Sequence, residues 1–325
     1  MSTLFLTEQG SRVVCRNHTL LLRQNNETLF IYPLDSLERL VLMGRIELSA
    51  GAMAKLLGRG IETLFLTRDG RFKGRLCAGV GKNIFLRELQ FKKRNESAFC
   101  LEFSRSLIQA KIKNCRAFLR RSGAAVLAAI DHRLINAEKS LALCNSLEQM
   151  RGIEGGFAAL YFRHFRTLLH NPMGFRKRQK HPPPDPVNIL LSFGYTLLFN
   201  QILALVETAG LDPYAGFFHQ SQYGHPALVS DLMEPYRHNV VDRLVLSLVN
   251  NQLIQESHFQ KEEKGYRFLP EGVRLFADRY RLALEKRFKS GDRQLTLWLI
   301  IKETVWQFCR YLEGKDNEFK PYIFR

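Results

Sequence analysis

The sequence predicts an α+β protein in which a small antiparallel β domain, a sandwich or roll with one short helix, precedes an all-α domain. Short apolar runs broken by turn residues fill the first 76 positions, which is typical of small strands. Helical periodicity runs through most of the chain after position 82. A chain of 325 residues, 46% of them hydrophobic, can form two cores. We therefore expect a β domain over residues 1–80 and an α-helical domain over residues 81–325.

The β domain is predicted from its turns and from one capped helix. Its apolar runs are TLFLT, SRVVCR, TLLLR and TLFIYPL, and the polar segment 24–26 separates the last two. Ser49 is a suitable N-cap for a short helix that glycines then terminate. Residues 61–67 are predicted to form a further strand, closed by a turn at residues 68–70.

The helical part contains three segments of special character. Glycines 79 and 81 form a hinge rather than a phosphate loop, because the third glycine and the lysine of such loops are missing. Residues 187–206 are apolar over the length of a membrane span, but five polar side chains within them favour a buried core helix. Residues 313–325 show little periodicity and are predicted to form a loose tail.

The charge of the chain indicates a polyanionic partner. The sequence has 48 Lys and Arg against 31 Asp and Glu, a formal net charge of +17 and a pI of about 9.8. Nucleic acid is the first candidate and an acidic membrane surface is the second, while a merely soluble basic protein is the plainest alternative. Six cysteines without a Cys-x-x-Cys pair predict reduced thiols, and the first residues lack a signal-peptide pattern, so we expect a cytoplasmic protein.

Three stretches carry side chains that bind metals. Glu154 is followed by two glycines and a helical run, and Ala158 and Tyr161 would share its helix face. A carboxylate near a helix N-terminus also has a purely structural explanation, since it complements the helix dipole. His219 ends an apolar turn, where a lone histidine is more often a core residue than a ligand.

The third stretch holds two acids on one helix turn. Asp231 and Glu234 are three residues apart, so both side chains project from the same side. A bound cation would relieve their repulsion, and Arg237, again three residues on, would do the same. One imidazole with two or three carboxylates suits Mg2+ or Mn2+, and the expected chemistry is phosphoryl transfer.

The densest basic run near these motifs lies between helical segments. It contains Arg176, Lys177, Arg178 and Lys180, in a proline-rich loop. We name these four residues as candidate DNA contacts, together with Arg237 and Arg243 after the acidic turn. For each of the six, an ordinary solvated surface charge is an equally good interpretation.

Several runs together resemble a known family. RGIEGGFAALYF, DPVNILLSFGYTLL, GLDPYAGFFH and SDLMEPYR occur in that order, after PLDSLERLVLMG and RGIETLFLTRDGRFKGRL. They resemble the CRISPR-associated spacer integrase family, the first-numbered Cas protein, over nearly the whole chain. The resemblance implies a β domain used for dimerisation, a helical catalytic domain, a homodimer, and assembly with the small second-numbered Cas protein on double-stranded DNA.

The resemblance also implies roles for single residues. The metal-binding and catalytic positions of the family fall on Glu154, His219 and Glu234, where some members have Asp at the last position. Asp231 matches a further, auxiliary acid, and Asn188 and Tyr195 match buried polar positions. His225 lies outside the pattern.

The expected activity is metal-dependent insertion of short DNA fragments next to the leader end of a repeat array. A free 3'-hydroxyl attacks a phosphodiester, and either Glu154 or Glu234 accepts its proton. Two alternatives remain at this point: a DNA-binding scaffold that has lost its metal, and a related nuclease that acts on RNA.

Overall fold

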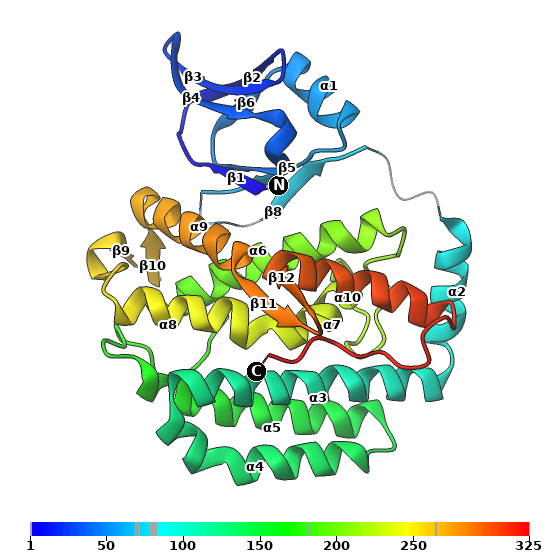
Figure 1. Ribbon diagram of the computed structural model, residues 1–325. Helices are drawn as coiled ribbons and strands as arrows, with labels where there is room; N and C mark the ends of the chain where they lie inside the picture. The colour runs from blue at the N-terminus through cyan, green and yellow to red at the C-terminus, as the bar shows by residue number, and fades with distance from the viewer. Residues whose placement is uncertain are drawn as a thin grey trace. The chain divides into compact units, whose positions relative to one another are not determined.

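The computed structural model describes residues 2–68, 70, 72–78, 83–180, 183–263 and 265–324. The chain forms two compact units. The first contains residues 1–80 and 254–282, and the second contains residues 81–253 and 283–325. The predicted hinge at residues 79–81 and Asp69 of the predicted turn lie outside the described residues. The α+β class is confirmed, with strands in small sheets followed by a helical region (Figure 1).

Two four-stranded sheets form the core of the first unit. One has the order β1-β5-β7-β8 and the other has the order β4-β3-β2-β6. The apolar side chains of this core include Leu20, Leu40 and Leu56, each fully buried. The strands are β1 (Ser2–Leu6), β2 (Ser11–Arg16), β3 (Thr19–Gln24), β4 (Glu27–Pro33), β5 (Leu37–Met43), β6 (Ile46–Leu48), β7 (Glu62–Leu66) and β8 (Phe72–Leu76).

The sheets are mixed: the predicted antiparallel pairing is found between β2 and β3, β3 and β4, and β7 and β8, and the other three pairs are parallel. β5 pairs in parallel with both β1 and β7, and β6 pairs in parallel with β2. Parallel neighbours require a crossover connection. Between β5 and β7 the chain supplies one with helix α1 (Ala50–Gly58), which begins as predicted, where Ser49 Oγ accepts a hydrogen bond from the Ala52 amide at 3.2 Å.

Residues 254–282 add a hairpin and a helix to the first unit. The elements are β9 (Phe259–Glu262), β10 (Gly265–Phe268) and most of α9 (Pro270–Glu285). On α9, Tyr280 is fully buried with its ring edge-on to Phe5 of β1, at a centroid separation of 6.4 Å. Arg274 Nε donates to Thr7 Oγ1 over 3.2 Å. From its sequence this segment was expected in the helical domain, because its periodicity is largely helical and periodicity does not report the partner of a helix.

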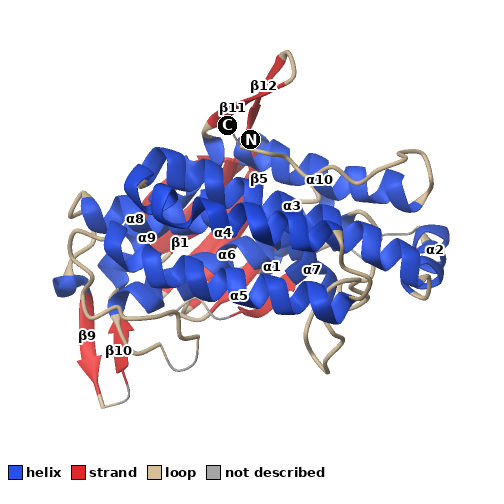
Figure 2. Cartoon of the chain, turned by 90° about the horizontal axis from the view of Figure 1, so that it is seen from below, coloured by secondary structure: helices blue, strands red, loops and turns tan. Residues whose placement is uncertain are grey.

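The second unit is a helical assembly organised around α3 (Figures 1 and 2). Helix α3 packs against α4 and α5, and also against the segment that follows α7. The helices are α2 (Ile84–Arg94), α3 (Ser97–Ser122), α4 (Ala124–Ala142), α5 (Leu147–Phe165), α6 (Pro186–Thr208), α7 (Ala227–Met233), α8 (Arg243–Asn250) and α10 (Leu297–Leu312). The unit is not all-helical, because β11 (Arg287–Ser290) and β12 (Arg293–Thr296) form a hairpin that Figure 2 shows standing out from the helices.

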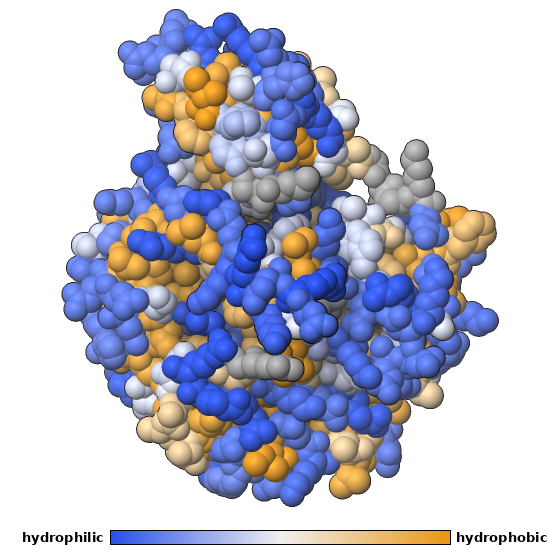
Figure 3. All heavy atoms as spheres, viewed as in Figure 1, coloured by the Kyte–Doolittle hydropathy of each residue, from blue (hydrophilic) through white to orange (hydrophobic). Residues whose placement is uncertain are grey.

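Helix α6 is the apolar segment that could be confused with a membrane span. By length and composition it is the one helix among the described residues that could cross a membrane, and 83% of its most apolar window is buried inside the structure. It contacts α7, α8 and α10. These contacts fit the predicted core helix. On the face shown in Figure 3, hydrophilic side chains cover most of the second unit.

The C-terminal segment after α10 is fixed rather than loose, so that prediction was wrong. Phe319 and Phe324 are each 2% exposed. Asn114 of α3 donates to the carbonyl of Tyr322 at 2.9 Å and accepts from the amide of Phe324 at 2.8 Å. An extended chain that buries a few bulky side chains needs no helical periodicity, which explains why the sequence pattern missed it.

Candidate active site

A cavity of about 640 Å³ in the second unit gathers most of the predicted site residues. Its walls come from α3, α5, α6, the basic loop before α6, the turn at His219 and the segment after α7. Glu154, His219 and Glu234 all line it. The remaining lining residues are Lys111, Ala158, Ala159, Tyr161, Phe162, Arg163, Arg176, Lys177, Arg178, Lys180, Tyr195, Arg237 and His238.

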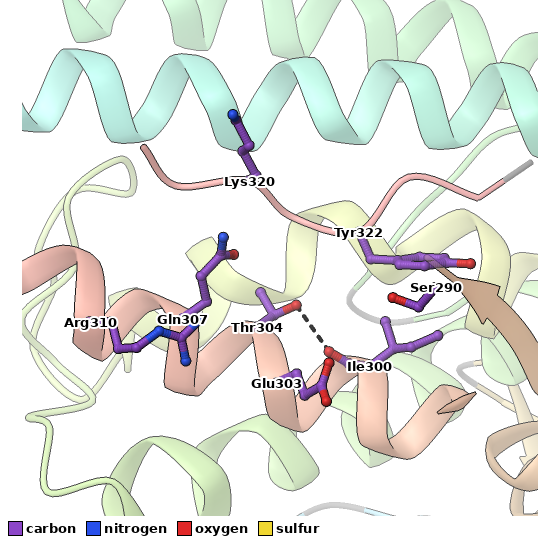
Figure 4. Close-up of a pocket in the computed structure, with 8 residues that line it drawn as sticks. All are labelled: Ser290, Ile300, Glu303, Thr304, Gln307, Arg310, Lys320 and Tyr322. Carbon is purple, nitrogen blue, oxygen red and sulfur yellow. Dashed lines mark hydrogen bonds between the residues drawn. The ribbon is translucent and has the colours of Figure 1, made fainter. Parts of the chain in front are cut away.

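A smaller hollow of about 190 Å³ lies between α10, β11 and the C-terminal segment (Figure 4). Thr304 in its wall donates to the carbonyl of Ile300 at 3.0 Å. The Arg310 guanidinium at its rim is paired with Asp316 at 3.1 Å. Among the described residues that line this hollow there is no histidine and the one acid is Glu303, so the larger cavity is the candidate active site.

Glu154 projects from the middle of α5. The helix begins at Leu147, where Ser146 caps it by accepting from the Gln149 amide at 3.2 Å. Glu154 therefore lies beyond the first turn, and the helix-dipole explanation for this acid does not apply. Ala158 and Tyr161 line the same cavity, which confirms that the three residues share a helix face.

Lys111 of α3 lies between two of the predicted ligands. Its Nζ contacts Glu154 Oε1 and lies 2.6 Å from Glu234 Oε2, and its side chain is 5% exposed. Burial alone would lower the pKa of Lys111, but Glu234 and Glu154 raise it above the ordinary value. Lys111 was not predicted from the sequence, because α3 carries many basic side chains and nothing in their spacing distinguishes one of them.

Glu234 is the most strongly paired acid of the cavity. It follows α7 in a short 3-10 turn, and its side chain is 4% exposed. Its Oε1 accepts from Arg237 Nε at 2.9 Å and lies 3.8 Å from His219 Nε2. Burial would raise the pKa of Glu234, yet Arg237, Lys111 and His219 together hold it far below the usual range. The carboxyl is therefore ionised at neutral pH.

Asp231 holds His219 in position. Its Oδ1 lies 2.6 Å from His219 Nδ1 and also accepts from the His219 amide at 2.9 Å. Its Oδ2 accepts from the amides of Phe217 and Phe218 at 2.7 and 3.1 Å. A carboxylate on Nδ1 orients the ring and leaves Nε2 facing Glu234 and the cavity. Burial lowers the pKa of His219, but Asp231 and Glu234 together outweigh burial, so the net shift is upward.

Tyr195 and the unpredicted Asp242 form a buried group beside the cavity. Asp242 ends a π-helical turn, His238–Asp242, and its carboxylate accepts from Tyr161 Oη at 2.8 Å and from Tyr195 Oη. Burial raises the pKa of Asp242 to about 6, although the two tyrosine hydrogen bonds oppose the rise. Local motif spacing could not reveal Asp242, because its partners come from α5 and α6.

Asn188 acts on the basic loop and does not line the cavity. Its Nδ2 donates to the carbonyl of Lys177 at 2.9 Å, and its Oδ1 accepts from Arg178 Nη1 at 3.0 Å. The Arg178 and Arg237 guanidinium groups lie 5.4 and 5.0 Å from the centre of the Tyr195 ring. The loop is thus fixed with its cations at the cavity.

Five of the six predicted DNA contacts line the cavity, and Arg243 does not. Arg176, Lys177, Arg178, Lys180 and Arg237 are in its wall. Arg243 begins α8, where burial and the nearby positive charge of Arg121 lower its pKa. Its place after the acidic turn suggested otherwise, but one turn of helix directs the side chain elsewhere.

The donor set has the chemistry that a hard divalent cation requires. Among the described residues, no group of three or more His, Cys, Asp and Glu side chains is close enough to enclose a metal ion. However, both carboxylates of the set contact one ammonium group, and the imidazole Nε2 lies beside the second carboxylate. Oxygen donors that already share a cation, next to an imidazole nitrogen that faces them, fit Mg2+ or Mn2+ in chemistry.

Comparison with known proteins gives consistent matches. The family model described as CRISPR associated protein Cas1 matches residues 4–281. The chain is 32% identical over 343 residues to a CRISPR-associated endonuclease Cas1 of Rhodospirillum rubrum, covering 100% of this chain and 99% of that protein.

Two solved structures share the fold. A casposase bound to its integration product has a TM-score of 0.86 and 21% identity, covering 100% of this chain and 95% of the casposase. A Cas6-RT-Cas1–Cas2 complex has a TM-score of 0.83 and 24% identity, covering 99% of this chain and 36% of that one.

Proposed function

The chain belongs to the CRISPR-associated Cas1 family, and from this membership we propose that it is a cytoplasmic, divalent-metal-dependent DNA integrase and endonuclease of CRISPR adaptation. Its reaction would insert short DNA fragments into a repeat array by attack of a 3'-hydroxyl. The observation that carries the proposal is the convergence of Glu154, His219 and Glu234 on one cavity whose walls also hold five Arg and Lys side chains from the predicted set.

In the proposed site Glu154, His219 and Glu234 would hold Mg2+ or Mn2+, and the ion would supply positive charge for polarising a phosphodiester and stabilising a leaving oxygen. Asp231 keeps His219 Nδ1 occupied, so Nε2 remains available as a ligand. Arg237 keeps Glu234 ionised and in place. The reaction needs no covalent nucleophile from the chain.

The bond changes balance without a further reactant. The 3'-oxygen of the incoming DNA forms a new bond to phosphorus while the bond from phosphorus to the target strand's 3'-oxygen breaks. One of the two cavity glutamates accepts the proton of the attacking hydroxyl, and the leaving oxygen takes up a proton. The number of phosphodiester bonds is unchanged, so the same site supports the reverse reaction, and with water as nucleophile it supports hydrolysis.

The cationic wall would deliver the DNA backbone to this site. Arg176, Lys177 and Lys180 are exposed on the loop that Asn188 fixes at the cavity mouth. Lys and Arg that neutralise phosphates provide affinity without reading base sequence. This arrangement supports a nucleic acid as the substrate class, and we propose double-stranded DNA.

Partner contacts are part of the proposal. β4 lies at the edge of its sheet and exposes Leu29, Phe30 and Ile31, of which Ile31 is 59% exposed. An apolar sheet edge of this kind pairs readily with another chain. We propose that a second copy covers it in a homodimer, and that the dimer assembles with the small second-numbered Cas protein. The similarity to a chain in a Cas1–Cas2 complex supports this assembly.

The activity is tested with purified protein, with and without the small partner, using DNA ends, a repeat-containing plasmid and Mg2+ or Mn2+. His219→Ala is expected to abolish joining and cleavage. His132→Ala is the matched control, because His132 is an exposed histidine of α4 that does not line the cavity. Unchanged joining in His219→Ala would contradict the proposal, and the absence of Mn2+ binding in calorimetry would favour a non-catalytic scaffold.

A further inference from the structure

Lys111 occupies the place between the two acids of the candidate metal centre. Its Nζ contacts Glu154 and Glu234 at once, and the latter distance is 2.6 Å. The side chain enters from the buried side of α3 and is 5% exposed, whereas Lys113, two residues on, is exposed to solvent. The ammonium group of Lys111 is therefore a buried component of the site, unlike that of the exposed Lys113 on the same helix.

This ammonium and a divalent ion cannot both occupy the carboxylate oxygens that Nζ contacts. A Mg2+ ion lies about 2 Å from its oxygen ligands, so an ion held by Glu154 Oε1 and Glu234 Oε2 would be in contact with Nζ. Two positive charges in contact inside a buried site repel strongly, because little water separates them. One cation must leave when the other enters.

The same pair of acids would be costly without any cation. Glu234 is buried, and its two carboxylate oxygens contact Arg237 and Lys111. Removing the cation that bridges it to Glu154 would leave two negative groups facing each other at low dielectric. Arg237 neutralises Glu234 from one side, but Lys111 is the one cationic group within salt-bridge distance of Glu154 in the part of the chain that the structure describes.

The released ammonium has a place to go. The cavity of about 640 Å³ adjoins Nζ, so the ammonium can move off the two carboxylates into open space. The ring of Phe157 lies 5.7 Å from Nζ and stabilises the ammonium in its metal-free position. Lysine also has a flexible four-carbon stem, so its charge can move several ångströms without any change in α3.

We propose that Lys111 is an internal cation that holds Glu154 and Glu234 together in the metal-free protein and is displaced into the cavity when a divalent ion binds. Lys111 is thus a positioning residue that keeps the site assembled and competes with the metal. The inference rests on the proposed function, since it takes these acids as metal ligands.

The test compares Mn2+ binding by the full-length protein, Lys111→Met and Lys113→Met in isothermal titration calorimetry. Met keeps most of the length of the side chain and removes its charge. We expect Lys111→Met to bind Mn2+ at least tenfold more tightly than the unmodified protein, and Lys113→Met to bind as the unmodified protein does. Metal-free Lys111→Met should also melt at a lower temperature than the unmodified protein, and Mn2+ should raise its melting temperature by a larger amount.

A second measurement needs no variant. Acetylation of lysines by an N-hydroxysuccinimide ester, read by mass spectrometry, should modify Lys111 slowly without Mn2+ and faster with it, while Lys113 reacts equally in both.

The outcomes separate this inference from the proposed function. The proposed displacement of Lys111 is wrong if the unmodified protein binds Mn2+ and Lys111→Met binds it equally or more weakly. It is also wrong if the unmodified protein binds Mn2+ without a change in Lys111 acetylation. In both cases the proposed metal site remains supported. If neither protein binds Mn2+, the metal site fails and the exchange fails with it. Binding by Lys111→Met alone would support the exchange strongly.

Discussion

Lys111 and Asn114 lie one turn apart on α3, and both are buried, yet the groups that surround them differ in kind. Lys111 faces the cavity and has charged partners on other elements. Asn114 faces backbone: its Nδ2 donates to the carbonyls of Pro235 and Tyr322, both at 2.9 Å, and its Oδ1 accepts from the Phe324 amide at 2.8 Å. The first cluster is charged and open to exchange, and the second is neutral and fully paired.

One helix can therefore support both chemistry and stability, provided that the two tasks fall on separate side chains. Asn114 fixes Pro235, the residue directly after Glu234, and ties the C-terminal segment to the same point. Neutral amide–carbonyl bonds stabilise without a need for counter-ions, whereas the carboxylates of the cavity retain attraction for any cation. Substitutions in the charged cluster around Lys111 should mainly change activity, and substitutions in the neutral cluster around Asn114 should mainly change stability.

The largest expected effect is a loss of DNA joining after substitution in the charged cluster around Lys111. Glu234→Gln removes a proposed metal ligand and the charge that Arg237 and Lys111 pair with, so DNA joining should fall on the order of a thousandfold. A plasmid integration assay with Mn2+ measures it. Glu148→Gln, an exposed glutamate in the first turn of α5, serves as the control. Joining within a few-fold of the unmodified protein would remove Glu234 from the site.

In the neutral cluster around Asn114, Asn114→Ala should lower the free energy of unfolding and leave the affinity for Mn2+ nearly unchanged. It leaves two buried carbonyls and one amide without their partner, which costs about 3 kcal/mol. Urea denaturation followed by circular dichroism measures the destabilisation, and Asn145→Ala, at an exposed asparagine, should change little. A Mn2+ affinity that falls while stability holds would show that Asn114 belongs to the metal site instead.

Asp242 is a buried acid beside the cavity, and its stability contribution should depend on pH. Its pKa is raised to about 6, so the folded protein binds this proton more tightly than the unfolded chain does. The free energy of unfolding should therefore fall as pH rises through this range, on the order of 1 kcal/mol between about pH 5 and pH 7. Denaturation at both pH values should show this slope reduced in Asp242→Asn and kept in Asp278→Asn, an exposed control.

The smallest expected effect belongs to the exposed cations of the loop. Replacing Lys177 and Lys180 together by Ala should reduce the slope of log DNA affinity against log salt by about 2, roughly one unit for each phosphate that a lysine no longer neutralises. Fluorescence anisotropy over a salt series measures the slope, and Mn2+ affinity should not change. An unchanged slope would identify both lysines as ordinary surface charges.

The parts of the site that could be predicted from the sequence are those with distinctive local patterns. Glu154 before two glycines, and Asp231 and Glu234 on one turn, could be recognised from spacing and from the family resemblance, and the structure brings Glu154, His219 and Glu234 to one cavity. Lys111 and Asp242 could not, because their roles come from partners more than 40 positions away in the chain.

The fold shows the same division. The predicted strands and most helices follow from local periodicity. Parallel pairing of β5 with β1 and β7, and the buried path of Phe319 and Phe324, depend on contacts between distant segments. Periodicity reports which face of an element is apolar, and it does not report what that face packs against.

The return of residues 254–282 to the first unit constrains how the molecule is made. The chain passes between the units three times, after residues 80, 253 and 282. A ribosome releases the first 80 residues long before it synthesises Tyr280, the side chain that meets Phe5. The N-terminal sheets must therefore wait, with part of their apolar surface uncovered, until nearly nine-tenths of the protein has emerged. Cutting the gene at residue 80 would yield two incomplete pieces rather than two domains.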